Sequence, residues 1–212
     1  GLATGETIGI GGNGDFSVSS LTGEIVRNKV ADVDLNGVYF VSPDEGWVIG
    51  EKGSVYGTSD RGKTWTKRDS TVENDLTDID CYGTACWIIG DNGLILISTD
   101  GDEWSQVESG TNVNLSAVDF LNENVGIVAG EKGVILKTTD GGHTWQHQRM
   151  VEDAKLCGPN FISEDFSLAD VSVADEENAW IVGDRLVAKY DSNAQVWRGE
   201  CLDGLIDAVG VV

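Results

Sequence analysis

Aspartates recur at a fixed place in a short motif, and carboxylates repeated in this way could take part in a reaction or bind a metal ion. The motif, [ST]-x-D-x-G-x-T-W, is complete around Asp60 and Asp140 and one residue shorter around Asp100. Such carboxylates could act as catalytic groups or calcium ligands. Asp and Thr side chains also hydrogen-bond the backbone of their own tight turn, and a tryptophan can anchor the turn between sheets. We favour this structural interpretation for the following residues: Thr58, Asp60, Gly62, Trp65, Ser98, Asp100, Trp104, Thr138, Asp140, Gly142 and Trp145.

Other reactive groups are sparse. The two histidines, His143 and His147, fall in and just after one of these turns, and neither has a nucleophile beside it in the sequence. There is no C-x-x-C pair, and the glycine-rich segment 9–14 precedes no helix that would complete a phosphate cradle. We therefore expect no catalytic residue, no metal site and no cofactor.

The cysteines leave two interpretations open. Cys81 and Cys86 flank a plausible hairpin turn, Cys157 lies in a long insertion, and Cys201 follows the last tryptophan-containing strand. Two disulfides would fit, although the spacing does not fix their pairing; four buried free thiols are the alternative. Disulfides would place the chain in an extracellular or other oxidising compartment. Because the first residues, 1–5, include no Met and no export signal, we interpret the start as a mature terminus or an excised domain.

Acidic residues dominate the composition. With 36 Asp and Glu against 14 Lys and Arg, the formal net charge is −22, which argues against binding to nucleic acids or anionic membranes. No apolar stretch is long enough to span a membrane. A cationic partner, bound cations or a high-salt habitat would accommodate this charge, as would a merely solvated surface.

A glycine that ends an apolar run and opens a tight turn recurs through the chain. Its copies are Gly11, Gly50, Gly90, Gly130 and a weaker Gly183. The first four are about 40 residues apart, the length of one propeller blade. With 28 glycines and 2 prolines, the composition suits many short strands. In the second repeat we predict strands at 37–41, 46–50, 54–58 and 64–67, and the one segment open to a helix is 151–155.

A leucine followed by apolar residues at plus three and plus five precedes four of these glycines. The series is Leu35/Val38/Phe40, Leu76/Ile79/Cys81, Leu115/Val118/Phe120 and Leu168/Val171/Val173. The first glycine has no such partner before it, whereas the pattern Leu205/Ala208 occurs at the other end of the chain. The sequence therefore predicts an all-β, five-bladed β-propeller of four-stranded antiparallel blades, forming a single domain over 1–212. Strand 205–212 would complete the blade started by 7–33 and remove the sheet edges, and 147–167 would be an insertion.

These repeats resemble the Asp-box (BNR-repeat) propellers. The run G-W-V-I-G-E-K-G-S-V-Y from Gly46, followed by T-S-D-R-G-K-T-W, is most similar to the photosystem II stability and assembly-factor group. So is the run V-G-I-V-A-G-E-K-G-V-I-L-K-T-T-D-G-G-H-T-W from Val125. The resemblance implies a propeller whose relatives are non-enzymatic assembly partners of membrane complexes. That group typically has more than five units, and this chain is unusually acidic.

Sialidases also carry Asp-box repeats, so a reduced glycoside hydrolase is an alternative. That resemblance would require an arginine cluster, a Tyr–Glu pair and an Arg-Ile-Pro signature. Neither Pro43 nor Pro159 follows Arg-Ile, and the chain has only six arginines. A lectin-like binder of carbohydrates or small ligands is a further alternative, because Trp47, Trp87 and Trp180 share one position in three repeats. We favour inter-blade core packing for these three rings.

Binding is expected on the face where the second-to-third-strand loops meet the loops between blades. A protein partner is the preferred ligand, and the insertion, which breaks the repeat, contributes two aromatic residues. The candidate binding residues are Glu51, Lys52, Asp91, Asn92, Glu131, Lys132, Asp184, Arg185, Phe161 and Phe166.

Overall fold

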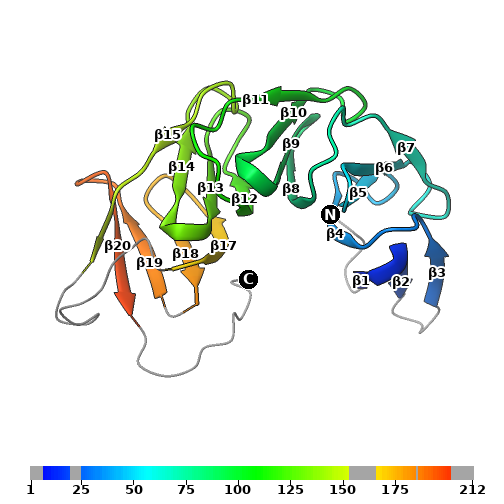
Figure 1. The fold of residues 1–212 in the computed structure, drawn as a ribbon, viewed down its shortest axis with the longest axis horizontal. Helices are drawn as coiled ribbons and strands as arrows, with labels where there is room; N and C mark the ends of the chain where they lie inside the picture. Colours follow the sequence, from blue (N-terminus) through cyan, green and yellow to red (C-terminus); the bar gives the residue numbers. More distant parts are fainter. Residues whose placement is uncertain (1–6, 20–24, 153–165, 185, 202–212) are drawn as a thin grey trace. The chain divides into compact units, whose positions relative to one another are not determined.

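The structure, a computed structural model, describes residues 7–19, 25–152, 166–184 and 186–201, and these form an all-β fold. Five sheets follow one another along the chain (Figure 1). The chain divides into two compact units, which are described separately. Unit 1 comprises Gly1–Gly90 and Leu96–Gln106, and unit 2 comprises Asp91–Ile95 and Val107–Val212.

Unit 1 contains sheets 1 to 3. Sheet 1 consists of β1 (Thr7–Gly11), β2 (Asp15–Ser19) and β3 (Ile25–Lys29), with the short 3-10 turn η1 (Gly12–Gly14) between the first two. Sheet 2 consists of β4 (Leu35–Phe40), β5 (Gly46–Gly50), β6 (Ser54–Thr58) and β7 (Thr66–Arg68). Sheet 3 consists of β8 (Leu76–Tyr82), β9 (Ala85–Gly90), β10 (Ile95–Ser98) and β11 (Ser105–Val107).

Unit 2 contains sheets 4 and 5 and the turns η2 (Asp91–Gly93) and η3 (Glu131–Gly133). Sheet 4 consists of β12 (Leu115–Phe120), β13 (Gly126–Gly130), β14 (Ile135–Thr138) and β15 (Gln146–His147). Sheet 5 has the order β16-β20-β19-β18-β17 and consists of β16 (Met150–Glu152), β17 (Leu168–Val173), β18 (Ala179–Gly183), β19 (Leu186–Asp191) and β20 (Val196–Cys201).

Alternating side chains pack consecutive sheets against each other. In unit 1, Phe16 of sheet 1 packs with Leu35 and Val48 of sheet 2, and its ring lies edge-on to Trp65 at a centroid distance of 4.9 Å. In unit 2, a larger cluster joins sheets 4 and 5 around the fully buried Trp197. In the first strands the repeated apolar residues, such as Leu76, Ile79 and Cys81, are buried as the sequence pattern predicts, whereas β5 and β13 are buried along their whole length.

The leucine that begins each first strand lies beside a bulge. In sheets 2 to 5 the pairing of the first strand with the second skips one residue directly after this leucine, as between Leu35 and Gly37. The bulge brings the carbonyl oxygen of Asp34 so close to Gly50 that a Cβ atom there would lie 2.1 Å from it. Gly90, Gly130 and Gly183 would meet the equivalent oxygens at 2.4, 2.5 and 2.4 Å. The repeated glycine is therefore required by close backbone approach.

The structure differs from the predicted blades in two sheets. Sheet 5 has a fifth strand, because β16 leaves the end of sheet 4 and pairs in parallel with β20, so this blade is neither four-stranded nor wholly antiparallel. Gly199 on β20 lies close to both neighbouring strands, since a Cβ there would lie 2.8 Å from Leu186 Cδ1 of β19 and 3.3 Å from Met150 Sδ of β16. The start of segment 151–155 is thus a strand rather than a helix. Sheet 1 has three described strands, and segment 205–212, predicted to complete it, lies outside the described residues.

The close approach at Gly50 predicts a specific loss of stability. Gly50→Ala should lower the free energy of unfolding by about 2–3 kcal/mol, because the backbone of Asp34 must move away from the new methyl group. Gly83→Ala is the control: Gly83 has a positive φ of 64° but nothing lies within 4 Å of its Cβ position, so it should cost only about 1 kcal/mol. Urea unfolding measures both, and an equal loss for the two variants would contradict this reason for the glycine.

Candidate functional site

The turns that join the second and third strands have one backbone conformation in four sheets. The second turn residue has a positive φ, as in Lys52 (56°), Asn92 (59°), Lys132 (54°) and Asn13 (59°). The next residue is a glycine that also has a positive φ, and a Cβ atom at Gly53 would lie 2.0 Å from the carbonyl oxygen of Val72. Two successive left-handed residues hold the turn tightly and leave the side chains of Lys52, Asn92 and Lys132 exposed.

A side chain from the following sheet caps three of these turns. The amide of Asn13 donates to Asp34 Oδ1 at 2.7 Å, that of Lys52 to Asp75 Oδ1 at 2.9 Å, and that of Asn92 to Asn114 Oδ1 at 3.0 Å. Each acceptor stands immediately before the leucine of the next first strand. The position of each turn is therefore fixed by the sheet that follows it.

Asn114 also connects two neighbouring candidate turns in unit 2. Its Nδ2 donates to Glu131 Oε1 at 3.2 Å while its Oδ1 accepts from Asn92. Glu51, Asp91 and Glu131, the first residues of their turns, are half-buried. The structure thus brings the turn residues 91–92 of sheet 3 and 131–132 of sheet 4 together through a single asparagine.

Two of the remaining candidate binding residues, Phe166 and Asp184, lie within the part of the chain that the structure describes. Phe166 lies against the core cluster of unit 2, and its carbonyl oxygen accepts from the amide of Gly133 at 2.7 Å. Asp184 is exposed, and its amide donates to Ser167 O at 3.1 Å. Phe161 and Arg185 lie outside the described residues. The end of the insertion therefore packs against the turn of sheet 4.

The carboxylates of the Asp-box motif are bound to their own turns. Asp60 accepts from the amide of Thr64 at 2.9 Å and from its hydroxyl at 2.7 Å, and Thr58 Oγ1 accepts from the amide of Gly62 at 3.0 Å. The corresponding bonds of Asp140 to Thr144 are 2.9 and 2.6 Å. These hydrogen bonds lower the pKa of both carboxyl groups to about 2. Asp100 accepts from the amides of Asp102 and Glu103, which likewise lowers its pKa.

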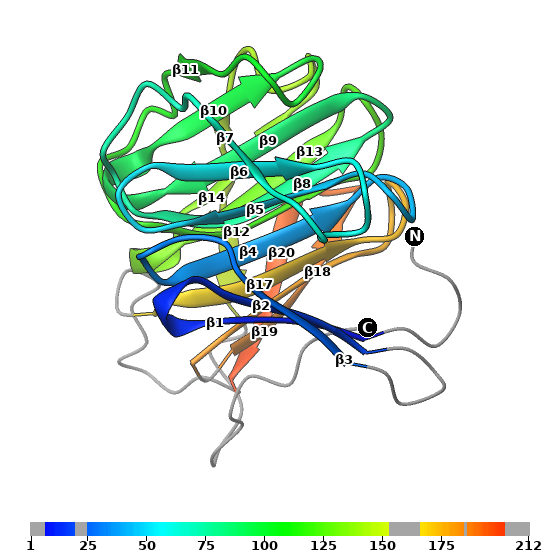
Figure 2. The same ribbon diagram turned by 90° about the vertical axis from the view of Figure 1, so that its right-hand side faces the viewer.

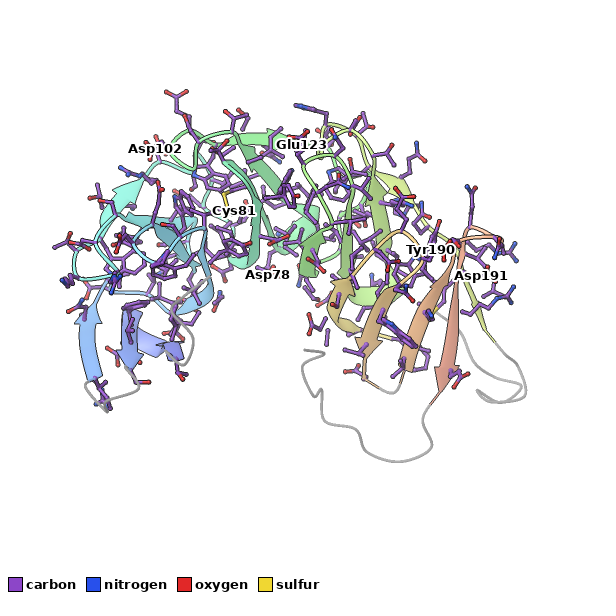
Figure 3. All side chains as sticks on the ribbon, turned by 180° about the vertical axis from the view of Figure 1, so that it is seen from behind. Asp78, Cys81, Asp102, Glu123, Tyr190 and Asp191 are labelled. Atoms are coloured by element: carbon purple, nitrogen blue, oxygen red, sulfur yellow. A yellow bond between two sulfur atoms is a disulfide. The ribbon has the colours of Figure 1, made fainter. Side chains whose placement is uncertain are left out.

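Each described Asp-box glycine in unit 1 covers an aromatic ring of the preceding sheet. A Cβ at Gly62 would lie 2.4 Å from Phe16, and one at Gly101 would lie 2.1 Å from Trp47. Trp47 Nε1 donates to the carbonyl oxygen of Gly101 at 2.9 Å. Asp102 belongs to the same turn (Figure 3), and its Oδ1 atom lies 2.8 Å from Arg68 Nε of sheet 2. These turns are therefore contacts between sheets.

The three repeated tryptophans do not share one environment. Trp47 and Trp87 are 4% and 2% exposed, as core packing requires, whereas Trp180 is 39% exposed. Core packing is thus the wrong interpretation for Trp180, whose ring instead lies 5.2 Å from Lys189 Nζ. No Asp-box turn among the described residues covers it, in contrast to Trp47.

One disulfide is present among the described residues. Cys81 and Cys86 are bonded across the hairpin of β8 and β9 (Figure 3), and the carbonyl oxygen of Cys81 accepts from Tyr39 Oη at 2.7 Å. Cys157 lies outside the described residues, and of Cys201 only the backbone, at the end of β20, is described.

A carboxyl group with a raised pKa lies on the first strand of sheet 4. Burial raises the pKa of Asp119, and the nearby Asp170 carboxylate adds to the effect. The amide of Val173 donates to this carboxylate, which therefore links β12 to β17. Among the described residues no three His, Cys, Asp or Glu side chains are grouped to hold a metal ion.

The structure also shows a hollow that the sequence analysis missed. In unit 2, a cavity of about 310 Å³ is lined by Lys137, Tyr190, Glu176 and Glu177 among others, with Lys137 Nζ 4.8 Å from the Tyr190 ring. It lies beside the turn of the fifth repeat, which keeps only Asp191 and Trp197 of the Asp-box motif and has lost the rest; there Asp191 Oδ2 lies 2.7 Å from Arg198 Nε (Figure 3). That loss is the signal in the sequence that could have located it.

Comparison with known families identifies the protein family to which this chain is related. The family model described as "Photosynthesis system II assembly factor YCF48" matches residues 18–113 and 102–202. The chain belongs to the Ycf48 assembly-factor family. This is the group to which the repeats were likened, and the resemblance is confirmed.

Curated relatives are similar but longer. The photosystem II assembly lipoprotein Ycf48 of a Synechococcus species is 27% identical over 150 residues, 66% of this chain and 45% of the relative. That of a Nostoc species is 30% identical over 177 residues, 80% of this chain and 47% of the relative. The chain thus spans about half the length of the curated relatives it matches.

Solved structures with a similar fold include a β-propeller. YCF48 from Cyanidioschyzon merolae superposes with a TM-score of 0.62 at 23% identity, covering 80% of this chain and 56% of the other. The WD40 propeller of Doa1 gives a TM-score of 0.70 at 10% identity, covering 93% of this chain and 64% of the other. The fold is therefore propeller-like. None of the described helices has the length and apolar character needed to cross a membrane.

The Asp-box carboxylates predict a pH dependence of stability. Because the pKa of Asp140 is lowered from 3.8 to about 2, its bonds stabilise the fold above about pH 4, and this contribution is lost as the pH falls towards 2. The Tm difference between the wild type and Asp140→Asn should therefore be largest above pH 4 and shrink towards pH 2. Thr144→Val, which removes one of the donors, should weaken the same pH dependence. A Tm difference that stays constant between pH 5 and 2 would contradict the assignment.

Proposed function

We propose that this chain is a non-enzymatic scaffold that binds a protein partner during assembly of a photosystem II-type membrane complex. The observation that carries the proposal is the family match over nearly the whole chain. Relatives named as photosystem II assembly proteins and lipoproteins support both the role and an exported location. The Asp-box carboxylates are committed to their own turns, which leaves those residues no part in catalysis.

The proposed contact surface consists of the second-to-third-strand turns at 51–52, 91–92, 131–132 and 184, with Phe166 beside the third. The turns at 51–52, 91–92 and 131–132 each contain a left-handed residue, and the first two are also capped by a side chain of the next sheet. Little conformational entropy is therefore lost in these turns when a partner binds. The exposed second residues of these turns are Lys52, Asn92 and Lys132, two charged groups and one amide. Such groups favour specific recognition over general adhesion.

Two lysine-to-asparagine changes test this surface. Asparagine occupies the same left-handed position in sheet 3, so Lys52→Asn with Lys132→Asn should keep the backbone and Tm while removing both charges. We expect wild-type chain to bind isolated photosystem II complexes and the double variant to bind at least about tenfold more weakly. The matched control is Lys67→Asn on the exposed strand β7. No binding by the wild type would contradict the function, and equal binding by the double variant would contradict the surface.

We further propose that the sheets form a closed five-bladed ring, with 205–212 as the first strand of sheet 1. The support is the sequence pattern together with β1, whose turn and Asp34 cap match those of the second strands in sheets 2 and 3. The plus-five residue counted from Leu205 is Gly210. In sheet 3 the plus-five residue of the first strand, Cys81, is disulfide-bonded to Cys86 of the second strand. The residue of β1 that corresponds to Cys86 is Thr7.

Closure predicts an engineered disulfide. In a background with Cys157 and Cys201 changed to serine, Thr7→Cys with Gly210→Cys should oxidise to an intramolecular bond, because it copies the Cys81–Cys86 pair. Thr7→Cys with Val209→Cys, one residue out of register, should not. Non-reducing electrophoresis and mass spectrometry measure both. Failure of the first pair to form, or its formation only between chains, would contradict closure.

A further inference from the structure

The hollow between sheets 4 and 5 occupies a place that is filled between sheets 2 and 3. In unit 1, Trp47 of sheet 2 pairs with Gly57, and the Asp-box turn of sheet 3 covers its ring, which is 4% exposed. The ring Nε1 donates to Gly101 O of that turn at 2.9 Å, and Arg68 of sheet 2 lies 2.8 Å from Asp102 of the same turn. A turn that offers a carbonyl oxygen and a charge partner thus closes the space between these two sheets.

Between sheets 4 and 5, which lie side by side in unit 2 (Figures 1 and 2), three of these features are changed. Ile127 stands where sheet 2 has Trp47, and its partner on the next strand is Lys137 instead of a glycine. The turn after β19, Ser192–Gln195, contains no glycine. A smaller side chain and a turn without the covering glycine thus accompany the hollow of about 310 Å³.

The hollow is lined by described residues of unit 2. It lies at the end of sheet 5 where the turn Ser192–Gln195 joins β19 to β20. At the opposite end of these two strands, Leu186 pairs with Cys201. The residues outside the described ranges that adjoin sheet 5 are connected to that opposite end; they are 153–165, 185 and 202–212. The hollow is therefore formed by the described strands and turns themselves.

Three charged side chains line the hollow. Lys137 is half-buried, and its Nζ lies 4.8 Å from the centre of the Tyr190 ring. Glu176 and Glu177 are exposed on the hairpin turn between β17 and β18. In the described part of the chain none of the three takes part in an ion pair. With one ammonium and two carboxylates, the lining has a formal charge of −1, which a single added positive charge would balance.

We propose that this hollow binds an arginine side chain presented by a turn of the protein partner, in the place that an Asp-box turn fills between sheets 2 and 3. The guanidinium donates to Glu176 and Glu177, because its planar fork of donors matches carboxylate oxygens. The ammonium of Lys137 donates to a backbone carbonyl oxygen of the same turn, as Trp47 Nε1 donates to Gly101 O. This inference rests on the proposed partner-binding function and names one group of the partner that is recognised.

Two blocked tripeptides serve as probes. One is acetyl-Gly-Arg-Gly amide, and the other carries citrulline, which has the shape of arginine without its charge. Each is titrated into the full chain at physiological ionic strength, where attraction between distant exposed charges is screened, and the backbone amide shifts are followed by NMR. We expect the arginine peptide to shift the amides of Glu177 and Gln195 saturably, and the citrulline peptide to bind at least about tenfold more weakly.

Charge variants separate the hollow from general attraction to an acidic chain. Glu176→Gln with Glu177→Gln should weaken binding of the arginine peptide at least about tenfold, because both carboxylate acceptors are lost. The matched control is Glu73→Gln with Glu108→Gln, which removes the same charge at two exposed glutamates outside the hollow. The control pair should bind the arginine peptide as tightly as the wild type.

A steric pair tests the place of binding without changing any charge. Ser192→Phe puts a ring into the hollow and should abolish binding, whereas Asn193→Phe, at the next residue, which is exposed and outside the lining, should leave binding unchanged. The Tm of both variants is measured alongside, and we expect both to fold.

The outcomes decide between the possibilities. Saturable binding of the arginine peptide that depends on Glu176 and Glu177 and is blocked by Ser192→Phe supports the proposal. No saturable binding, equal binding of the citrulline peptide, or equal weakening by the control pair would overturn it. Preferential binding of acetyl-Gly-Glu-Gly amide would also overturn it, because the hollow would then select an anion through Lys137. The native partner is absent from this experiment, so its failure while photosystem II complexes still bind leaves the scaffold function standing.

Discussion

The structure depends on the residue immediately before each first strand. Asp34 shows this most fully: its carbonyl oxygen accepts from the amide of Glu51 at 3.1 Å, and its carboxylate accepts from the amide of Asn13 at 2.7 Å. Asn114 makes the same pair of contacts, with Glu131 at 2.9 Å and Asn92 at 3.0 Å. One residue thus holds the turn of its own sheet through the backbone and the turn of the preceding sheet through its side chain. The same contact therefore recurs in each of the two units.

Two classes of turn follow from this arrangement, and they have different uses. The Asp-box turns use their polar groups within the turn itself: Asp60 and Asp140 accept from their own threonines, while Gly62 and Gly101 press on rings of the preceding sheet. The turns after the second strands have fixed backbones and exposed side chains. A scaffold needs both, because rigid contacts between sheets allow the exposed turns to present a partner with a surface that is already ordered.

Much of the fold could be predicted from the sequence, because the period of the apolar residues and the spacing of the repeats encode the strands. Strands β5 and β6 have the predicted bounds. Strand β4 begins two residues and ends one residue earlier than predicted, since the bulge after Leu35 is invisible to a period-two pattern, and β7 begins two residues and ends one residue later. The parallel pairing of β16 with β20 could not be predicted, because it joins residues far apart in the chain, such as Met150 and Trp197, and no repeat marks it. The exposure of Trp180 was also missed, because the same residue at the same position is buried in sheets 2 and 3.

The candidate site was less predictable than the fold. The sequence located the turns, but neither the capping role of Asp34, Asp75 and Asn114 nor the link from Asn114 to Glu131 has a local signature, since donor and acceptor are about 20 residues apart in separate sheets. The closed ring, the single domain and the binding roles of the turn residues stay predictions.

Amide hydrogen exchange in Asp75→Ala tests most directly whether each sheet holds the turn of the one before it. Asp75 stands at the start of sheet 3, and its carboxylate accepts the amide of Lys52 in sheet 2. The account predicts that this variant exchanges the Lys52 amide markedly faster than the wild type, while amides within β5 and β6 keep their protection. Unchanged protection at Lys52, with loss confined to sheet 3, would contradict it.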